Sequence, residues 1–169
     1  PARRLIRVYR DRVAFVAFDA CPVFCRFCFR KRLFGPNVER AACSSLEGAI
    51  RYIAHTPEIR DVLLTGGDPL MATDVWLEDL LKRIRAIPHV EIIRLGTRMP
   101  VALPQRVTLE LCRMLERYHP IWINTHFNHP KELTPEAALA CDRLTKAGVP
   151  VGNQTVLLKG VNDDAKVMR

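Results

Sequence analysis

The chain has 169 residues, 49% of them hydrophobic, with a net charge of +8 and six cysteines. This length supports one buried core and therefore one domain over residues 1–169, and no apolar run is long enough to span a bilayer. Three of the six cysteines share one short loop and the others are scattered, which is typical of a reducing compartment rather than a disulfide scaffold. We therefore expect a cytoplasmic protein without a membrane partner.

Strand-like and helix-like segments alternate along the chain. Apolar segments predict strands at 13–18, 62–65, 91–95, 121–125 and 150–158. Amphipathic segments predict helices from Ser44 or Ser45 to about Ala54, from Thr73 to before Pro88, from Leu109 to Arg117, from Thr134 to Gly148, and one beginning within 162–167. The last four strands recur about every 30 residues, the length of a βα unit. The pattern favours an α/β fold in which a parallel sheet with outer helices curls toward a barrel; a doubly wound sheet has the same periodicity.

A cysteine-rich loop follows the first predicted strand and reads Cys21-Pro-Val-Phe-Cys25-Arg-Phe-Cys28. Three thiolates can hold three irons of a cubane cluster, whereas a closed iron–sulfur site or a structural zinc site takes four protein ligands. The spacing therefore predicts a cluster with one open iron, at which an external molecule can bind. A zinc site completed by a remote residue such as His126 is the alternative.

Basic residues surround this loop. Arg26, Arg30, Lys31 and Arg32 flank the cysteines, and five arginines precede the first predicted strand. Such a patch can bind nucleic acid, or small anions such as a cofactor phosphate and amino acid carboxylates. Because the charge converges on the cysteine loop, we favour small anions and expect no nucleic acid partner.

Five motifs, in register along the chain, resemble one enzyme family. The cysteine spacing, with Phe27 before the last cysteine, is similar to the signature of the radical S-adenosylmethionine (SAM) superfamily. The longer motifs resemble its lysine 2,3-aminomutase branch: Cys25-Arg-Phe-Cys28-Phe-Arg30-Lys-Arg32, Thr65-Gly-Gly-Asp68-Pro-Leu70, Leu95-Gly-Thr-Arg98-Met-Pro100, Asn124-Thr-His126-Phe-Asn128-His-Pro130 and Asn153-Gln-Thr-Val-Leu-Leu-Lys-Gly-Val-Asn162-Asp163.

The resemblance implies a radical SAM core domain, a partial βα barrel that we expect to be truncated at its C-terminus. It implies that Cys21, Cys25 and Cys28 bind a [4Fe–4S] cluster whose open iron binds the amino and carboxylate groups of SAM. An electron from the cluster would then cleave the sulfonium and release a 5′-deoxyadenosyl radical. The implied contacts to SAM are Phe27, Gly66, Gly67, Asp68, His126 and Gln154. Each also has an ordinary explanation, such as a turn for Gly66 to Asp68 or a buried histidine for His126.

Three further residues receive roles from the resemblance. Arg30 would bind the α-carboxylate of an amino acid substrate, for which a guanidinium is suited. Tyr9 and Arg12 would contact pyridoxal phosphate, with Arg12 on its phosphate; both could instead be surface residues at a strand edge. For Arg98 two roles stay open, namely binding another anion and forming a structural ion pair.

The implied activity is that of an isomerase, an amino acid 2,3-aminomutase. Such an enzyme moves an α-amino group to the β-carbon through a 5′-deoxyadenosyl radical and an aldimine of pyridoxal phosphate. The expected partners are a free amino acid, lysine first, and a reductant protein such as flavodoxin or ferredoxin; a homo-oligomer stays open. The family's aldimine lysine falls beyond Arg169, so no residue here receives that role. Phe29 is more typical of the branch that modifies elongation factor P.

Two alternatives stay open. One is a radical SAM enzyme of another class that uses no pyridoxal phosphate. The other is a basic zinc-knuckle module that binds nucleic acid and is not an enzyme.

Overall fold

A computed structural model describes residues 4–31 and 46–168 of the chain. Its strands are β1 (Leu5–Ile6), β2 (Arg12–Phe18), β3 (Asp61–Gly66), β4 (Ile92–Gly96), β5 (Ile121–Thr125) and β6 (Val151–Asn153). Its α-helices are α1 (Leu46–Ala54), α2 (Asp74–Arg85), α3 (Met99–Ala102), α4 (Leu109–Glu116) and α5 (Pro135–Lys146), with short 3-10 helices η1 (Pro69–Met71), η2 (Pro104–Arg106) and η3 (Pro130–Glu132). The predicted cap at Ser44 or Ser45, Arg32 and Cys43 lie outside the described residues.

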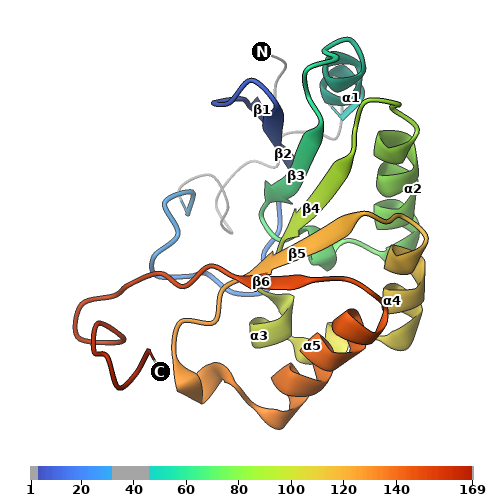
Figure 1. Cartoon of the computed structure of the whole chain (residues 1–169). Coiled ribbons are helices and arrows are strands. Elements are labelled where there is room, and N and C mark those ends of the chain that lie inside the picture. Colours follow the sequence, from blue (N-terminus) through green and yellow to red (C-terminus); the bar gives the residue numbers. More distant parts are fainter. Residues whose placement is uncertain (1–3, 32–45, 169) are drawn as a thin grey trace.

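The strands form one sheet whose spatial order follows the sequence, β1-β2-β3-β4-β5-β6. The pairs from β2 to β6 are all parallel, and only β1 runs antiparallel to its neighbour. A doubly wound sheet would reverse its strand order partway, so the observed order selects the barrel-like alternative. The sheet stays open between β1 and β6, which confirms the predicted partial βα barrel (Figure 1).

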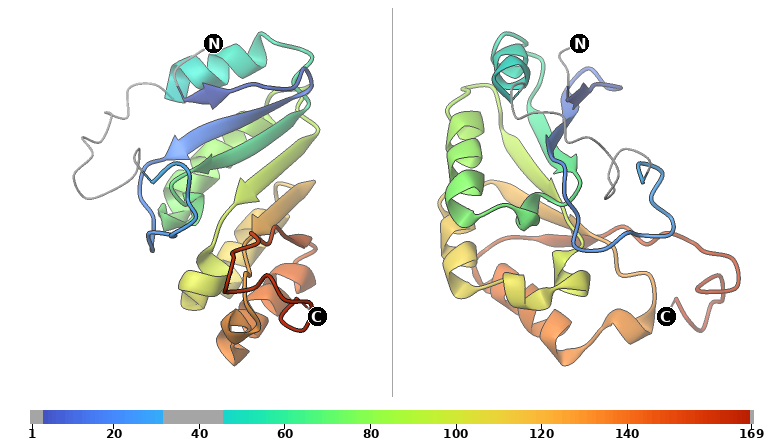
Figure 2. Two further views of the ribbon diagram at one scale, coloured as in Figure 1. Left: turned by 90° about the vertical axis from the view of Figure 1, so that its left-hand side faces the viewer. Right: turned by 180° about the vertical axis from the view of Figure 1, so that it is seen from behind.

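The helices cover one face of this sheet, whereas the cysteine loop and the segment after β6 lie on the other side (Figure 2). Alternate strand residues, among them Phe15, Leu64, Leu95 and Ile123, are fully buried against the helical layer. Alternation arises because successive side chains of a strand point to opposite faces. The opposite, less covered face is therefore free to line a site. Among the described residues, no helix is both long and apolar enough to cross a membrane.

Three threonines start helices, Thr73 and Thr134 as predicted and Thr108 just before the helix predicted from Leu109. The Oγ1 atoms of Thr73, Thr108 and Thr134 accept hydrogen bonds from the backbone N–H three residues later, at the N-termini of α2, α4 and α5. Each bond satisfies one of the donors that the first helical turn leaves unpaired. These caps fix where each βα unit turns back along the sheet.

Two predicted elements differ from the structure after Asn153. The strand expected over 150–158 ends at Asn153 because Val156 and Leu158 donate their N–H groups to the side chains of Asn128 and Asn162 instead of a neighbouring strand. The helix expected to begin within 162–167 is a series of turns. Gln154 therefore follows β6 rather than lying within a strand. The short strand β1 and the helix α3 were not predicted.

Candidate functional site

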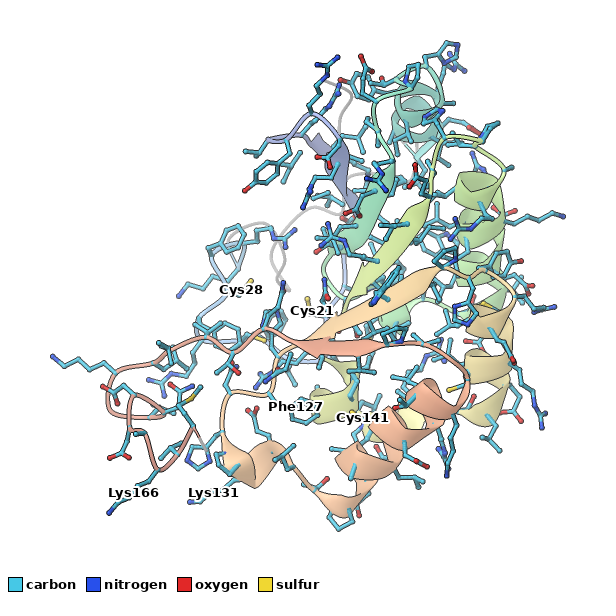
Figure 3. The ribbon with its side chains drawn as sticks, viewed as in Figure 1. Cys21, Cys28, Phe127, Lys131, Cys141 and Lys166 are labelled. Atoms are coloured by element: carbon cyan, nitrogen blue, oxygen red, sulfur yellow. The ribbon has the colours of Figure 1, made fainter. Side chains whose placement is uncertain are left out.

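A pocket of about 370 Å³ lies at the carboxyl ends of β2 to β6, on the side of the sheet that carries the cysteine loop. Figure 3 shows Cys21 and Cys28 on this side, well apart from Cys141 in the helical layer. The pocket brings together ten of the residues that sequence analysis singled out. They are Cys21, Cys25, Phe27, Cys28, Arg30, Gly66, Gly67, Asp68, His126 and Gln154. These motifs thus meet at one edge of the sheet, while their individual roles stay predictions.

The cysteine loop is a series of turns after β2. Cys28 donates its N–H to the carbonyl of Cys25 at 3.1 Å, and Lys31 donates to Cys28 at 3.3 Å. All three thiols are partly exposed. Burial, followed by the charge of Asp68, raises the pKa of the Cys21 thiol to about 11. A soft cation would therefore have to displace a proton from Cys21 on binding.

The thiols of the cysteine loop are a donor set that fits an iron–sulfur cluster. A zinc site needs four ligands around one point, whereas three cysteines of a cubane each bind a different iron. Three separate thiols beside one pocket match what a cubane cluster requires.

Two glycines allow the loop after β3 to pack against the end of β2. Gly66 has φ +123, and a Cβ there would lie 2.3 Å from the carbonyl oxygen of Phe18. A Cβ on Gly67 would lie 2.2 Å from the carbonyl oxygen of Ala20. The N–H of Gly67 donates to Phe18 at 2.6 Å. Glycine is required here for the close approach of two backbones, and this contact fixes the chain just before Cys21.

Asp68 joins the loops that follow β3 and β4. Its Oδ1 accepts from the hydroxyl of Thr97 at 2.6 Å and from the N–H of Leu70 at 3.0 Å, and its Oδ2 accepts from the N–H of Arg98 at 2.7 Å. Burial raises the pKa of this carboxyl, and these three hydrogen bonds oppose the shift. The residue is only 4% exposed. The contact from Asp68 to SAM stays a prediction, and in this structure the carboxylate binds groups of the protein itself.

Arg30 folds back over the sheet from the cysteine loop. Its Nη2 donates to Oγ1 of Thr65 at 3.0 Å, and its Cζ lies 5.1 Å from the centroid of the Phe29 ring. The Phe29 side chain itself is 86% exposed. These contacts aim the guanidinium into the pocket beside the cysteines, which is where a substrate carboxylate would have to lie.

His126 and Gln154 bring the ends of β5 and β6 together. Nδ1 of His126 lies 2.5 Å from the carbonyl oxygen of Gln154. Because a carbonyl only accepts, Nδ1 must donate, and in the neutral ring Nε2 is the acceptor. The His126 and Phe27 rings lie 6.0 Å apart. The geometry thus leaves the Nε2 lone pair available to a ligand.

Tyr9 and Arg12 do not line this pocket. Arg12 is the first residue of β2, at the opposite end of the strand from the cysteine loop. Its guanidinium lies 5.2 Å from the Tyr9 ring centroid and pairs with Asp11 at 3.1 Å, and Tyr9 is 63% exposed. Their contact with pyridoxal phosphate stays a prediction.

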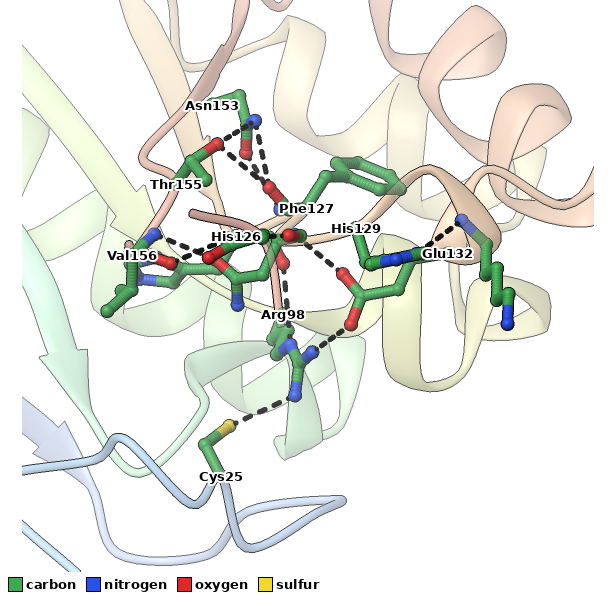
Figure 4. Close-up of polar contacts among 12 residues, drawn as sticks. Cys25, Arg98, His126, Phe127, His129, Glu132, Asn153, Thr155 and Val156 are labelled. Atoms are coloured by element: carbon green, nitrogen blue, oxygen red, sulfur yellow. Dashed lines mark hydrogen bonds and ion pairs between the residues drawn. The ribbon is translucent and has the colours of Figure 1, made fainter. Parts of the chain in front are cut away.

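Arg98 forms an ion pair with Glu132, which is one of the two alternatives left open for it above. Figure 4 shows its guanidinium between Cys25 and Glu132, next to the backbone of His126. The motif Leu95-Gly-Thr-Arg98-Met-Pro100 places Arg98 directly after a predicted strand. No local signal indicates Glu132 as its partner.

Known proteins are similar to this chain over all or nearly all of its length. The model of the Radical SAM superfamily matches residues 15–168. All 169 residues align with L-lysine 2,3-aminomutase of Fusobacterium nucleatum at 55% identity, with L-lysine 2,3-aminomutase of Acetoanaerobium sticklandii at 51%, and with glutamate 2,3-aminomutase of Clostridioides difficile at 48%. The chain spans 40%, 41% and 40% of the lengths of these relatives, respectively.

The superfamily match covers nearly the whole chain, including the cysteine loop and all the other motifs. Members of this superfamily are enzymes, which confirms the prediction of an enzyme over a zinc-knuckle module. The family also implies a [4Fe–4S] cluster and SAM, in agreement with the donor set of the loop. The chain belongs to the radical SAM superfamily.

Proposed function

We propose that the whole protein is a radical SAM 2,3-aminomutase, an isomerase that acts on a free amino acid. The observation that carries the proposal is one pocket lined by Cys21, Cys25, Cys28 and Arg30. It joins a candidate cluster site to a candidate carboxylate site. The names of relatives about half identical over the whole chain support the same reaction class.

The three cysteines would hold the cluster, and the loop of Gly66 and Gly67 would offer backbone polar groups to SAM. When bound, the cluster and SAM supply the radical that abstracts a hydrogen atom. The protein's own task is to hold the reacting groups in place and to exclude water. Phe27 and Val156 contribute apolar walls to the pocket.

Arg30 would orient the substrate. A guanidinium binds a carboxylate through two parallel hydrogen bonds, which fixes the plane of the carboxylate and the direction of its bond to Cα. Among the described residues the Arg30 guanidinium donates only to Thr65, through Nη2, so its other nitrogens can serve this purpose. The relatives act on lysine and on glutamate according to their names, and we propose lysine first for this protein.

We also propose pyridoxal phosphate as a second cofactor of the whole protein. Tyr9 and Arg12 would contact it, with the Arg12 guanidinium on the phosphate, and the resemblance to the aminomutase branch supports this assignment. A reductant protein such as flavodoxin or ferredoxin, a cytoplasmic location and a homo-oligomer are proposed on the same ground.

A second candidate is a radical SAM enzyme that uses no pyridoxal phosphate. The specific observation in its favour is that Tyr9 and Arg12 lie outside the pocket of the cysteines. It requires the same cluster and the same SAM site, so it differs from the first candidate only in its second cofactor and its product.

One experiment separates the two candidates. The whole protein is reconstituted anaerobically with iron and sulfide, supplied with SAM, pyridoxal phosphate and a reductant, and assayed for β-amino acids over a panel of α-amino acids. The first candidate predicts a β-amino acid product that requires pyridoxal phosphate. Cleavage of SAM that is indifferent to pyridoxal phosphate and yields no β-amino acid would favour the second.

A further inference from the structure

Arg98 lies where three loops of the site meet. Its backbone N–H donates to Oδ2 of Asp68 at 2.7 Å, which fixes it to the loop after β3. Its Nη1 donates to Sγ of Cys25 at 3.4 Å, and its Nε donates to the carbonyl of His126 at 3.4 Å (Figure 4). The side chain is 18% exposed. The backbone of Arg98 therefore binds the loop after β3, while its guanidinium contacts both the cysteine loop and the loop after β5.

The partner of this cation is equally well fixed. Nη2 of Arg98 donates to Oε1 of Glu132 at 2.5 Å, and Oε2 of Glu132 accepts the N–H of Asn128 at 2.7 Å. The Glu132 side chain is 23% exposed. The Phe27 ring covers the guanidinium, with Cζ 5.4 Å from its centroid. Both charges are thus held in place by the protein, shielded from much of the solvent that would otherwise screen them.

We propose that Arg98 is a positioning residue that orients the Cys25 ligand and that its charge, balanced by Glu132, sets the reduction potential of the cluster. The inference rests on the proposed cluster at Cys21, Cys25 and Cys28. Hydrogen bonds to the ligand sulfurs and nearby charges are known determinants of cluster potentials. The N–H donor at Cys25 and the fixed ion pair provide both.

The sign of each effect follows from charge. Reduction of the cluster from its 2+ to its 1+ state adds one electron, which dithionite supplies in a titration, and so adds one negative charge. A cation near the cluster stabilises the reduced state, whereas an anion opposes it. Removing the charge of Arg98 should lower the potential, and removing the charge of Glu132 should raise it.

The variants Arg98→Gln, Arg98→Lys and Glu132→Gln test this, with Arg60→Gln as the matched control. Arg60 pairs with Glu91 in the same kind of ion pair, but both side chains are about half exposed. Arg60 also directly precedes β3, at the end of the sheet opposite the site. Its substitution removes one positive charge from the chain without touching the cysteine loop.

The experiment is a redox titration of the whole reconstituted protein, followed by electron paramagnetic resonance, with iron and sulfide content measured on each sample. We expect the midpoint potential to shift to more negative values in Arg98→Gln and to less negative values in Glu132→Gln. It should stay unchanged in Arg60→Gln, and Arg98→Lys should lie between Arg98→Gln and the wild type.

Potentials that do not move in either variant, or that move in the same direction, would overturn the inference. If Arg98→Gln fails to bind iron, the two other variants test the inference. The potential should then be less negative than that of the wild type in Glu132→Gln and more negative in Arg98→Lys. A wild-type protein that assembles no cluster contradicts the proposed function itself, and that outcome is separate from unshifted potentials in a protein that does assemble one.

Discussion

The hydroxyl of Thr97 donates a 2.6 Å hydrogen bond to the buried carboxylate of Asp68, and so joins the loop after β4 to the loop after β3. The Oγ1 atom of Thr97 also accepts a hydrogen bond from the N–H of Met99 at 3.0 Å, at the start of α3. Thr97 is 3% exposed, so water cannot replace either bond. The Thr97 side chain therefore fixes the loop after β4, which carries Arg98, against the loop after β3.

Replacing Thr97 by Val should destabilise the protein while keeping its shape. Valine has nearly the volume of threonine, but it removes one of the three hydrogen bonds to the Asp68 carboxylate and the acceptor of the Met99 N–H, at a cost of about 1–3 kcal/mol. The melting temperature of the whole protein measures the effect. Thr97→Ser retains the hydroxyl and should melt close to the wild type; equal melting of Thr97→Val and Thr97→Ser would show that the bond contributes nothing.

Gly67 should not tolerate a side chain. In Gly67→Ala the new Cβ would meet the backbone of Ala20, which cannot move without displacing the cysteine loop, and we expect a loss of about 1–3 kcal/mol. Cluster content and melting temperature should both fall. The control is Gly48→Ala, in α1, where nothing lies within 4 Å of the new Cβ. That variant should be more stable than the wild type by about 0.5–1 kcal/mol, and similar losses in both would refute the steric explanation.

Cys21 should react slowly with iodoacetamide in the cluster-free protein. Its pKa of about 11 lies two units above the ordinary 9.0, so at pH 8 its thiolate fraction, and with it the alkylation rate, should be about 100-fold lower than for an unfolded cysteine. The raised pKa means that the thiol stays protonated as pH rises, so the rate should climb tenfold per pH unit through pH 8 to 10. Mass spectrometry of the Cys21 peptide, folded against urea-unfolded, gives both rates. A rate that levels off below pH 9 is the contrary result.

Arg30→Lys should impair substrate binding more than cluster assembly. Lysine keeps the charge but cannot form two parallel hydrogen bonds to a carboxylate, and a charged hydrogen bond contributes about 1.5–3 kcal/mol. The KM for the amino acid should therefore rise about 10- to 100-fold in the whole enzyme, with unchanged iron content. Lys31→Gln is the control on the same loop, since Lys31 is exposed and lies outside the pocket. An unchanged KM in Arg30→Lys would remove Arg30 from the substrate site.

The sequence predicted the four strands from 13 to 125 and two of the helix caps because their causes are local. Thr73 and Thr134 precede amphipathic stretches, and an oxygen at that position satisfies the first helical turn wherever the helix packs. The spacing of Cys21, Cys25 and Cys28 likewise depends on residues close together along the chain. Each of these features could be read within a window of a few residues.

What could not be predicted depends on partners distant in sequence. The segment after Asn153 has the apolar pattern of a strand, but the side chains of Asn128 and Asn162 take its backbone N–H groups. Arg98 has its charge partner 34 residues away, at Glu132. The close approach at Gly67 involves Ala20, on another strand's loop. Such pairings follow from the folded sheet and leave no local signal.

We propose that three cysteines hold a [4Fe–4S] cluster whose fourth iron is open to SAM. Mössbauer spectroscopy of the whole protein, reconstituted with ⁵⁷Fe and recorded with and without SAM, can observe that iron separately. We predict that one iron site of the four changes its isomer shift when SAM is added, while the other three do not. A spectrum that SAM leaves unaltered, or a protein that binds zinc in place of a cluster, would show that no open iron binds SAM here.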